Sequence, residues 1–485
     1  MAQSKSKSSK NNGMIAVIIA IILVLALTVY VVADGMLNRT SLLTDKSLIA
    51  SVSSLLKKFP VNITQKDLED VKVLVIEMNQ YGEEGYKLAF GYDNALELIK
   101  KQEIEEEEHK ENPDEDTHNH DDENVEDLLV SAVSENNIKD FSSLSLFVNV
   151  EYLIIMGPDA SYGTMNELKN LSFIENMTSL KNARIINTAA TDFSPFGKLN
   201  SLKNLNVQYC RIKDTDVFAN LTSLETLNLT VTGISDISFV SSLENIKDLY
   251  IRGNEITDIS AVKNLAKLRD LYLDSNQIED ISALSNLPSL KNLNLSSNKI
   301  KNINALSNLN SLEIIYLSNN EIEDASPAFS SSLKTISLND NKLIGIEGIQ
   351  NCAILRNINI DDNEIFDISP VSGLTELETL TAENNYISDL SPLESLVNLV
   401  GVSFSNNRIT SVSPLKSLEN LNYLYIDGNM IEDFSPLSEL EELGLMIDGK
   451  DSQYIDYDSD NDNDGAENED EENGEDENED DENND

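Results

Sequence analysis

The sequence predicts an α/β solenoid: an arc of stacked repeats with a concave parallel β-sheet and short helical or 3-10 turns on the convex side. A 22-residue pattern returns along most of the chain, as in LYIRGNEITDIS at 249–260 and LYLDSNQIEDIS at 271–282. Apolar and polar residues alternate before each Asn, which indicates a strand with one buried face. One such unit cannot bury its apolar face alone, so stacked units must share a continuous core.

Residues 14–33 form an uncharged apolar stretch that is long enough to span a bilayer as a helix. Three lysines precede it, so the positive-inside rule predicts a cytoplasmic basic tail at 1–13 and an external remainder. Small residues ending at Ala33 also fit signal-peptide cleavage, which would secrete the chain. We favour an uncleaved transmembrane signal anchor, and both alternatives export the chain.

Residues 34–94 are predicted to form a linker and a helical N-terminal cap with the first repeat. Thr64 is placed to cap a short helix together with Asp67, three residues later. Leu74, Ile76 and Asn79 then follow the strand pattern. The cap is therefore expected to open the sheet.

Residues 95–127 are rich in acidic side chains and contain every His of the chain, namely His109, His118 and His120. Such a composition cannot form a packed core, so a disordered insert is expected. His among carboxylates is also a ligand mixture suited to Zn²⁺ or Ni²⁺. A solvated loop with incidental His is the simpler interpretation.

The repeat array is assigned to residues 128–447, where one residue per repeat turns the chain out of the strand. A buried Asn amide must be hydrogen-bonded, and the neighbouring turns supply backbone partners, so a ladder is expected. Thr or Cys fills this position with fewer hydrogen bonds, which predicts a weaker section at 188–232. The ladder residues are Asn136, Pro158, Thr188, Cys210, Thr232, Asn254, Asn276, Asn298, Asn320, Asn341, Asn363, Asn385, Asn407 and Asn429.

Ser-Pro pairs recur behind the strands, as at 194–195 and 391–392. Ser is a good N-cap and Pro is tolerated at the first helical position, which predicts short convex turns with Ser as the cap. The Asp of the DIS motif recurs with the repeat, which indicates a structural turn position. Cys210 and Cys352 lie about six strands apart, roughly 30 Å, so they cannot form a disulfide.

The array is expected to end with one last strand near Leu443 and Leu445. Residues 448–485 form a predicted disordered acidic tail. Within it Asp460, Asp462, Asp464 and Glu471 match the spacing of an EF-hand loop. No cofactor is expected to be required. Weak Ca²⁺ binding is the alternative, although diffuse cation binding by such an acidic tail is the simpler interpretation.

The L-x-x-L-x-L-x-x-N-x-I-x-D-I-S pattern resembles the leucine-rich repeat, and its 22-residue version resembles the internalin type of bacterial surface protein. The resemblance covers about residues 62–448, apart from the acidic insert. It implies a non-catalytic binding role at the cell surface. No L-P-x-T-G sorting motif or basic Gly-Trp module is present, so the N-terminal segment is the expected anchor.

A formal net charge of −50 argues against nucleic-acid binding, because phosphate would be repelled. Since the array contains no His, Ser-His-Asp and Cys-His catalytic arrangements are impossible there. The recurring carboxylates follow the repeat and do not form a separate pair. A non-enzyme is therefore predicted.

Two columns of variable residues, four and two positions before each ladder residue, are expected on the concave face. Tyr and Arg are enriched in interface hot spots, so an aromatic group with flanking charges is the candidate contact patch. An acidic stripe follows it toward the C-terminus. The candidate partner-binding residues are Tyr250, Arg252, Tyr272, Asp274, Tyr316, Asp361, Glu383, Tyr425 and Asp427.

These observations predict a monomeric, membrane-anchored or secreted protein whose concave sheet binds another protein or, as the lesser alternative, a glycan. A rigid arc would lose little entropy on binding. Two other functions are compatible with the sequence. One is an envelope protein that responds to divalent cations through its acidic segments, and the other is a structural role in assembly.

Overall fold

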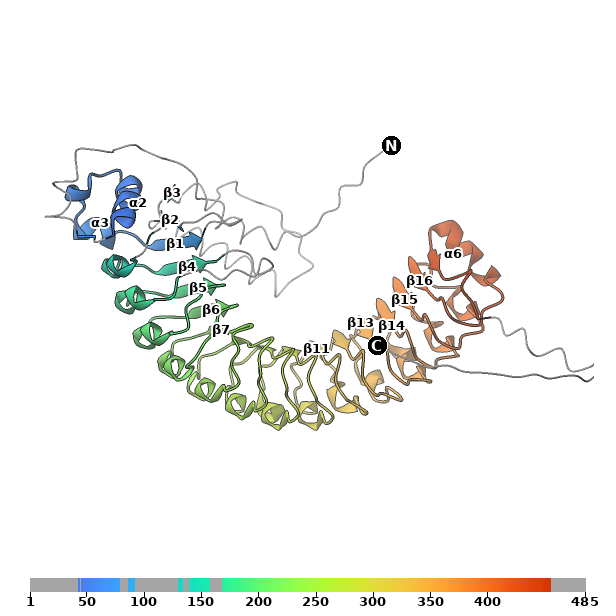
Figure 1. Cartoon of the computed structure of the whole chain (residues 1–485). Helices are drawn as coiled ribbons and strands as arrows, with labels where there is room; N and C mark the ends of the chain where they lie inside the picture. The colour runs from blue at the N-terminus through green and yellow to red at the C-terminus, as the bar shows by residue number, and fades with distance from the viewer. Residues whose placement is uncertain are drawn as a thin grey trace, which may run out of the picture.

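The computed structural model describes residues 42–43, 45–78, 86–91, 130–133, 138, 140–157 and 168–454. They form an arc in which the strands line the inner side and short helices the outer side, as predicted (Figure 1). The expected segments at 1–13, 14–33 and 95–127, and residues 455–485 of the acidic tail, lie outside the described residues. In the described part of the chain, no helix has the length and apolar character needed to cross a bilayer.

The N-terminal cap consists of α2 (Lys46–Leu56), a 3-10 turn (η1, Pro60–Asn62) and α3 (Gln65–Glu69). Thr64 and Asp67 form the predicted capping box, since each side chain accepts a hydrogen bond from the backbone N–H of the other. Lys58 donates to the Asp67 carboxylate, and this bond together with those from Thr64 lowers the pKa of Asp67 to about 2. This cap covers the apolar end of the repeat stack.

The first three strands do not follow the repeat pattern throughout. Strand β1 (Val73–Met78) pairs in parallel with β4 (Tyr152–Met156), so the sheet continues across the predicted insert. However, β2 (Tyr86–Gly91) is antiparallel to β1, and β3 (Val130–Val133) is antiparallel to β2. The strand before Asn136 is therefore not a repeat strand, contrary to the prediction, and β2 and β3 form an antiparallel end to the sheet.

From β4 onward each strand pairs in parallel with the next, and equivalent repeat residues lie opposite each other, as Leu249 and Leu271 do. Within the described residues the sheet has 17 strands. The remaining strands are β5 (Asn182–Ile186), β6 (Asn204–Gln208), β7 (Thr226–Asn228), β8 (Asp248–Tyr250), β9 (Asp270–Tyr272), β10 (Asn292–Asn294), β11 (Ile314–Tyr316), β12 (Thr335–Ser337), β13 (Asn357–Asn359), β14 (Thr379–Thr381), β15 (Gly401–Ser403), β16 (Tyr423–Tyr425) and β17 (Met446–Asp448).

The convex side carries one 3-10 turn per repeat, which confirms the predicted short helical turns. Because these turns occupy more space than the strands, the stack curves with the sheet inside. The turns are η2 (Ser142–Leu146), η4 (Ser172–Asn176), η5 (Ser194–Lys198), η6 (Asp216–Asn220), η7 (Ser238–Ser242), η8 (Ser260–Val262), η9 (Ser282–Asn286), η10 (Asn304–Leu306), η11 (Ser326–Ala328), η12 (Ile349–Asn351), η13 (Ser369–Gly373), η14 (Ser391–Leu393), η15 (Ser413–Leu415) and η16 (Ser435–Leu437).

The capping residue of these turns differs from the prediction. Ser occupies the first position of the turn and donates its backbone N–H to the Asp two residues earlier, as Ser260 does to Asp258 at 2.7 Å. The same bond joins Ser391 to Asp389 at 2.8 Å. The Asp of the DIS motif therefore satisfies the free N–H group at the start of the turn, which explains why it recurs with the repeat.

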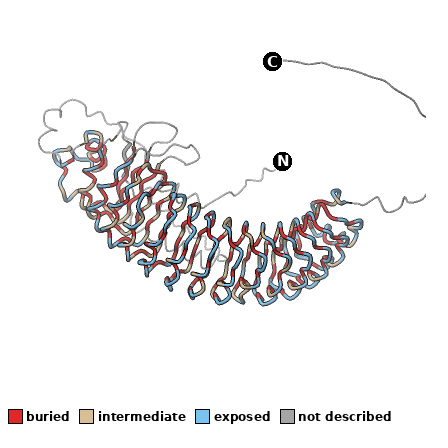
Figure 2. Tube along the Cα trace, turned by 60° about the horizontal axis from the view of Figure 1, so that its bottom comes forward, coloured by how far each residue is buried: buried red, intermediate tan, exposed pale blue. Residues whose placement is uncertain are grey.

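Leu, Ile and Phe side chains form one continuous core between the sheet and the convex turns. Buried residues accordingly recur along the whole arc (Figure 2). Phe193, Phe218 and Phe239 lie in successive contact through it, with ring centroids 5.7–6.2 Å apart. Cys210 and Cys352 are buried and not disulfide-bonded, as predicted. Burial raises the pKa of the Cys352 thiol to about 12, so the thiol stays protonated and inert.

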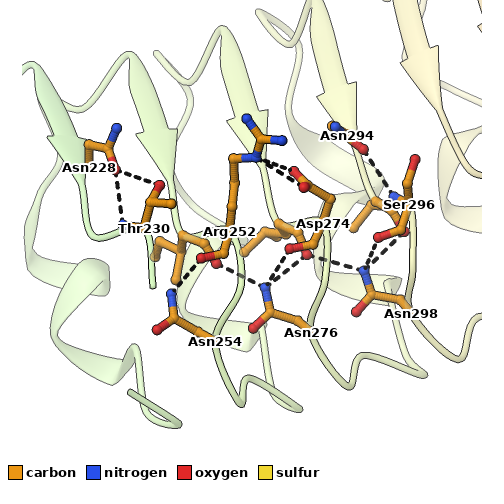
Figure 3. A network of polar contacts seen from close by, with 12 residues as sticks. Asn228, Thr230, Arg252, Asn254, Asp274, Asn276, Asn294, Ser296 and Asn298 are labelled. Carbon is orange, nitrogen blue, oxygen red and sulfur yellow. Dashed lines mark hydrogen bonds and ion pairs between the residues drawn. The ribbon is translucent and has the colours of Figure 1, made fainter. Parts of the chain in front are cut away.

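The predicted Asn ladder is present on the edge of this core (Figure 3). The Asn276 amide donates to the carbonyl groups of Ile251 and Leu273, both at 2.9 Å, and its oxygen accepts from the Ile256 N–H at 3.0 Å. The Thr232 hydroxyl lies 2.9 Å from the Leu229 carbonyl and 3.2 Å from the Asn254 amide oxygen, so Thr232 makes fewer hydrogen bonds than Asn276, as expected. Cys210 departs from the expectation, since its thiol contacts Thr188, Ile185 and Gln208.

A left-handed residue precedes most ladder positions, because the chain must turn sharply out of the strand. Asn, Ser, Asp and Gly fill most of these positions, and Val231 is an exception with φ of 53°. A β-branched residue is strained in this conformation. Gly253 occupies the next such position, where an added Cβ would lie 2.9 Å from a Val231 methyl group.

The predicted last strand is present but begins later than expected. Leu443 is the last residue of α6 (Ser438–Leu443), and the final strand β17 begins at Met446, because Gly444 adopts φ of 112° and ends the helix. Gln453 then takes the role of a ladder residue: its oxygen accepts from Ile431 N–H at 3.1 Å and its amide donates to Ile426 O at 2.9 Å. This closes the hydrogen-bond ladder.

Candidate binding surface

The concave face is built from three columns of side chains, two, four and six positions before each ladder residue. On β1 and β4 this face is buried as well, with Val75 and Ile154 at most 1% exposed. From β6 to β16 the concave positions are mostly polar, aromatic or acidic. Since the strands fix their spacing, this part of the arc is a preorganised surface.

The predicted aromatic group is only partly assembled. Tyr250 and Tyr272 stack on adjacent strands, with ring centroids 5.0 Å apart and planes inclined by 23°. Tyr316 lies on β11, two strands beyond Tyr272, and Asn294 of β10 occupies the position between them. The stack therefore contains two rings, and Tyr316 is a separate candidate contact residue two strands away.

Arg252 and Asp274 lie next to the stack and form an ion pair. The Arg252 Nε atom is 2.9 Å from one Asp274 carboxylate oxygen and 3.0 Å from the other (Figure 3). Asp274 is 7% exposed, whereas the Arg252 side chain is about half exposed. The pair thus presents a held guanidinium to the concave surface, with its carboxylate beneath.

A carboxylate pair on the other side of the stack lies in a third column, outside the two that were predicted to form the contact surface. Asp248 and Asp270, six positions before the ladder, are 8% and 5% exposed. The Arg269 guanidinium lies 3.3 Å from each. Thr226 donates to Asp248 at 3.0 Å, and Asn292 donates to Asp270 at 2.6 Å. The signal was available, since acidic residues recur there at the 22-residue spacing.

The electrostatics of this region follow from burial and like charge. Burial, and then the neighbouring Asp270, raise the pKa of Asp248 to about 6, although Arg269 opposes the shift. Burial and the nearby carboxylates also raise the pKa of Tyr250 and Tyr272 above the usual range. Both phenols therefore remain neutral hydrogen-bond donors at physiological pH.

The predicted acidic stripe lies on β13 to β16 and the turns that follow them. Asp361 accepts hydrogen bonds from the Glu383 N–H at 2.7 Å and the Thr381 hydroxyl at 3.0 Å, and burial raises its pKa. Ser403 donates to Glu383. Tyr425 is 45% exposed, more than the stacked pair, and Asp427 is half-buried in the turn beyond it. These residues form a second, more acidic section of the concave face.

The sequence-predicted metal ligands cannot be placed. His109, His118 and His120 lie outside the described residues, as do Asp460, Asp462, Asp464 and Glu471. Within the described ranges, no group of three or more His, Cys, Asp or Glu side chains is arranged to hold a metal ion.

Comparisons with known proteins agree with this geometry. A family model described as leucine-rich repeats (2 copies) matches residues 244–286, 288–330 and 397–439. The crystal structure of internalin InlF from Listeria monocytogenes is similar with 24% identity and a TM-score of 0.58, over 85% of this chain and 96% of InlF. Internalin C2 of the same organism is 34% identical over 43% of this chain and 83% of C2, with a TM-score of 0.35. The matched segments are leucine-rich repeats, and the fold is similar to that of the internalin InlF.

Leucine-rich repeat arcs also occur outside bacteria. The ectodomain of the plant receptor kinase GASSHO1/SCHENGEN3 from Arabidopsis thaliana, solved in complex with CASPARIAN STRIP INTEGRITY FACTOR 2, is 19% identical with a TM-score of 0.52. That match covers 64% of this chain and 42% of the plant chain, and it shows the fold alone. A search of curated proteins gave no match.

Proposed function

We propose that this chain is a non-catalytic binding protein whose concave sheet recognises another protein. The observation that carries the proposal is the Tyr250–Tyr272 stack, held between the Asp248–Asp270 pair and the Arg252–Asp274 pair. Such a surface offers aromatic contact area and hydrogen bonds in fixed positions. Because this surface is already ordered, the chain loses little conformational entropy when a partner binds.

The chemistry of the surface supports binding over catalysis. Its buried carboxylates form ion pairs with Arg252 and Arg269 and accept hydrogen bonds from Thr226 and Asn292. The two phenols remain protonated. The plant receptor ectodomain, solved with a bound factor, supports protein recognition by an arc of this fold. The acidic section at Asp361, Glu383, Tyr425 and Asp427 would extend the contact toward the C-terminus, and a glycan is the lesser alternative ligand.

The test is capture of a partner from cell-surface extracts by the purified chain, followed by measurement of affinity for that partner. Tyr250→Ser/Tyr272→Ser should weaken binding about 30-fold or more, because truncating hot-spot residues costs about 2 kcal/mol or more. The comparison variant is Tyr423→Ser/Tyr425→Ser, which removes two exposed rings of the acidic section and should weaken binding less. Loss in this variant alone would move the site to the acidic section, and loss in neither would refute recognition by either aromatic group.

We also propose that the chain acts outside the cytoplasmic membrane, held there by residues 14–33. The uncharged length of this segment and the lysines before it support this arrangement. Membrane fractionation with external protease treatment should leave the array in the membrane fraction and accessible. Recovery of a soluble form that begins just after Ala33 would instead support secretion.

A further inference from the structure

We propose that the flank of the arc formed by the segments leaving β12, β13 and β14 is a second docking surface, for a basic protein segment that carries apolar side chains. It lies beside the concave face and does not depend on the proposed concave site. Its core is formed by Ile344, Phe366 and Tyr386, which we call the flank patch.

The flank patch departs from the repeat pattern. The third residue after the ladder position is polar in most repeats and apolar in two consecutive ones, where Ile344 and Phe366 are 60% and 64% exposed. These side chains contribute little to the core. Single exposed apolar residues are common, but two on neighbouring repeats in the same register form a patch that favours contact with another molecule. The polar residues at this position are Thr191, Lys213, Ser235, Thr257, Glu279, Lys301, Glu323, Ser388, Thr410 and Glu432.

Backbone hydrogen bonds join the three segments that carry the flank patch. The Glu364 N–H donates to the Leu343 carbonyl at 2.8 Å, and the Tyr386 N–H donates to the Ile365 carbonyl at 2.8 Å. The segments carrying the three patch residues therefore lie side by side. Tyr386 is 47% exposed, and the Arg408 guanidinium lies 4.5 Å from the centre of its ring. This cation–π contact orients the ring at one end of the patch.

The charges around the patch indicate the chemistry of its partner. The same repeats carry exposed carboxylates, and in the described part of the chain none of them forms a salt bridge. Of the nearby cations, Lys342 is paired with Glu321 at 2.8 Å and Arg408 is held over the Tyr386 ring. A second copy of this chain would bring like charges together, whereas a basic segment would be attracted. The carboxylates are Asp340, Glu347, Asp362 and Glu364.

The probe is a labelled synthetic peptide of alternating Lys and Leu, titrated against the full chain by fluorescence anisotropy. A peptide of alternating Lys and Ser carries the same charge without apolar side chains. The Lys-Leu peptide should bind at least about 10-fold more tightly, since burying one large apolar side chain accounts for such a factor. Equal binding of the two peptides, or no binding of the Lys-Leu peptide, would overturn the proposal.

Paired substitutions test whether the Lys-Leu peptide binds at the flank patch. Ile344→Ser/Phe366→Ser should weaken Lys-Leu binding about 10-fold or more, whereas Val397→Ser/Val400→Ser, which removes two other exposed apolar side chains, should change it less than twofold. An equal loss in the control pair would contradict the assignment.

Two further variants test the charge and the independence of the site. Asp362→Asn/Glu364→Gln should weaken Lys-Leu binding and reduce its salt dependence, because fewer charges attract the peptide. Asn suits position 362, since it takes the same left-handed conformation at 384. If Tyr250→Ser/Tyr272→Ser abolishes peptide binding instead, the peptide occupies the concave face and the flank proposal fails while the concave function stands.

Discussion

Replacement of Asn276 by Ala tests the hydrogen-bond ladder directly. The substitution removes the donor to the Ile251 and Leu273 carbonyl groups and the acceptor of the Ile256 N–H, all at 2.9–3.0 Å. Leaving a buried backbone group without a partner costs about 1–3 kcal/mol. Two of the three groups come from the adjacent strand or turn, so we expect a loss of about 3 kcal/mol in the free energy of unfolding.

The assay is urea unfolding followed by circular dichroism, with Gln277→Ala as the control. Gln277 is exposed and adjacent, so its replacement should stay within about 0.5 kcal/mol of the wild type. Asn276→Thr should fall between the two, because Thr keeps one donor, as Thr232 does. A loss below about 1 kcal/mol for Asn276→Ala, or one equal to that of the control, would refute the energetic role of the ladder.

Three further predictions concern single positions. Because the folded-state pKa of Asp248 is raised to about 6, the contribution of Asp248 to stability is present below pH 4 and lost as the pH rises through 6. The stability of Asp248→Asn relative to the wild type should therefore increase by up to about 2–3 kcal/mol from pH 4 to pH 7.5, as measured by paired urea titrations. Val231→Asn should raise stability by about 1 kcal/mol and increase the melting temperature, since Asn tolerates φ of 53° better than a β-branched residue. Asp258→Ala should cost about 1 kcal/mol at pH 7 in urea unfolding, and because the bond from Ser260 lowers the Asp258 pKa, the difference from the wild type should shrink as the pH falls below 4. An unchanged difference across pH for Asp248→Asn, or a loss of stability for Val231→Asn, would contradict the corresponding argument.

The parts that could be predicted are those set by short or periodic sequence relationships. The Thr64–Asp67 capping box spans three residues, and the Asn ladder repeats a local strand-to-turn pattern that needs the same backbone partners each time. The error in the turn caps was also local. The Asp two residues before Ser260 reaches its N–H, so the Ser hydroxyl is not needed as the cap.

Other features depended on which strands pair. The carboxylates of Asp248 and Asp270 are 22 residues apart, and only the parallel register places them beside one Arg269 guanidinium. Tyr316 has the same residue type and column as the stacked pair, but the intervening strand separates it from Tyr272. The direction of β3 could not be read from its apolar pattern, because parallel and antiparallel strands share the same alternation.

The sequence by itself determined the repeat, the buried face of each strand, the ladder and the short convex turns, because these depend on side chains within one 22-residue unit and its identical neighbour. The tertiary structure decided the antiparallel end of the sheet, the two-ring stack with its buried charges, and the exposed flank of Ile344, Phe366 and Tyr386. The physical reason is that side-chain pKa values, contacts between rings and the exposure of side chains depend on the distance and packing between repeats. No single repeat specifies these.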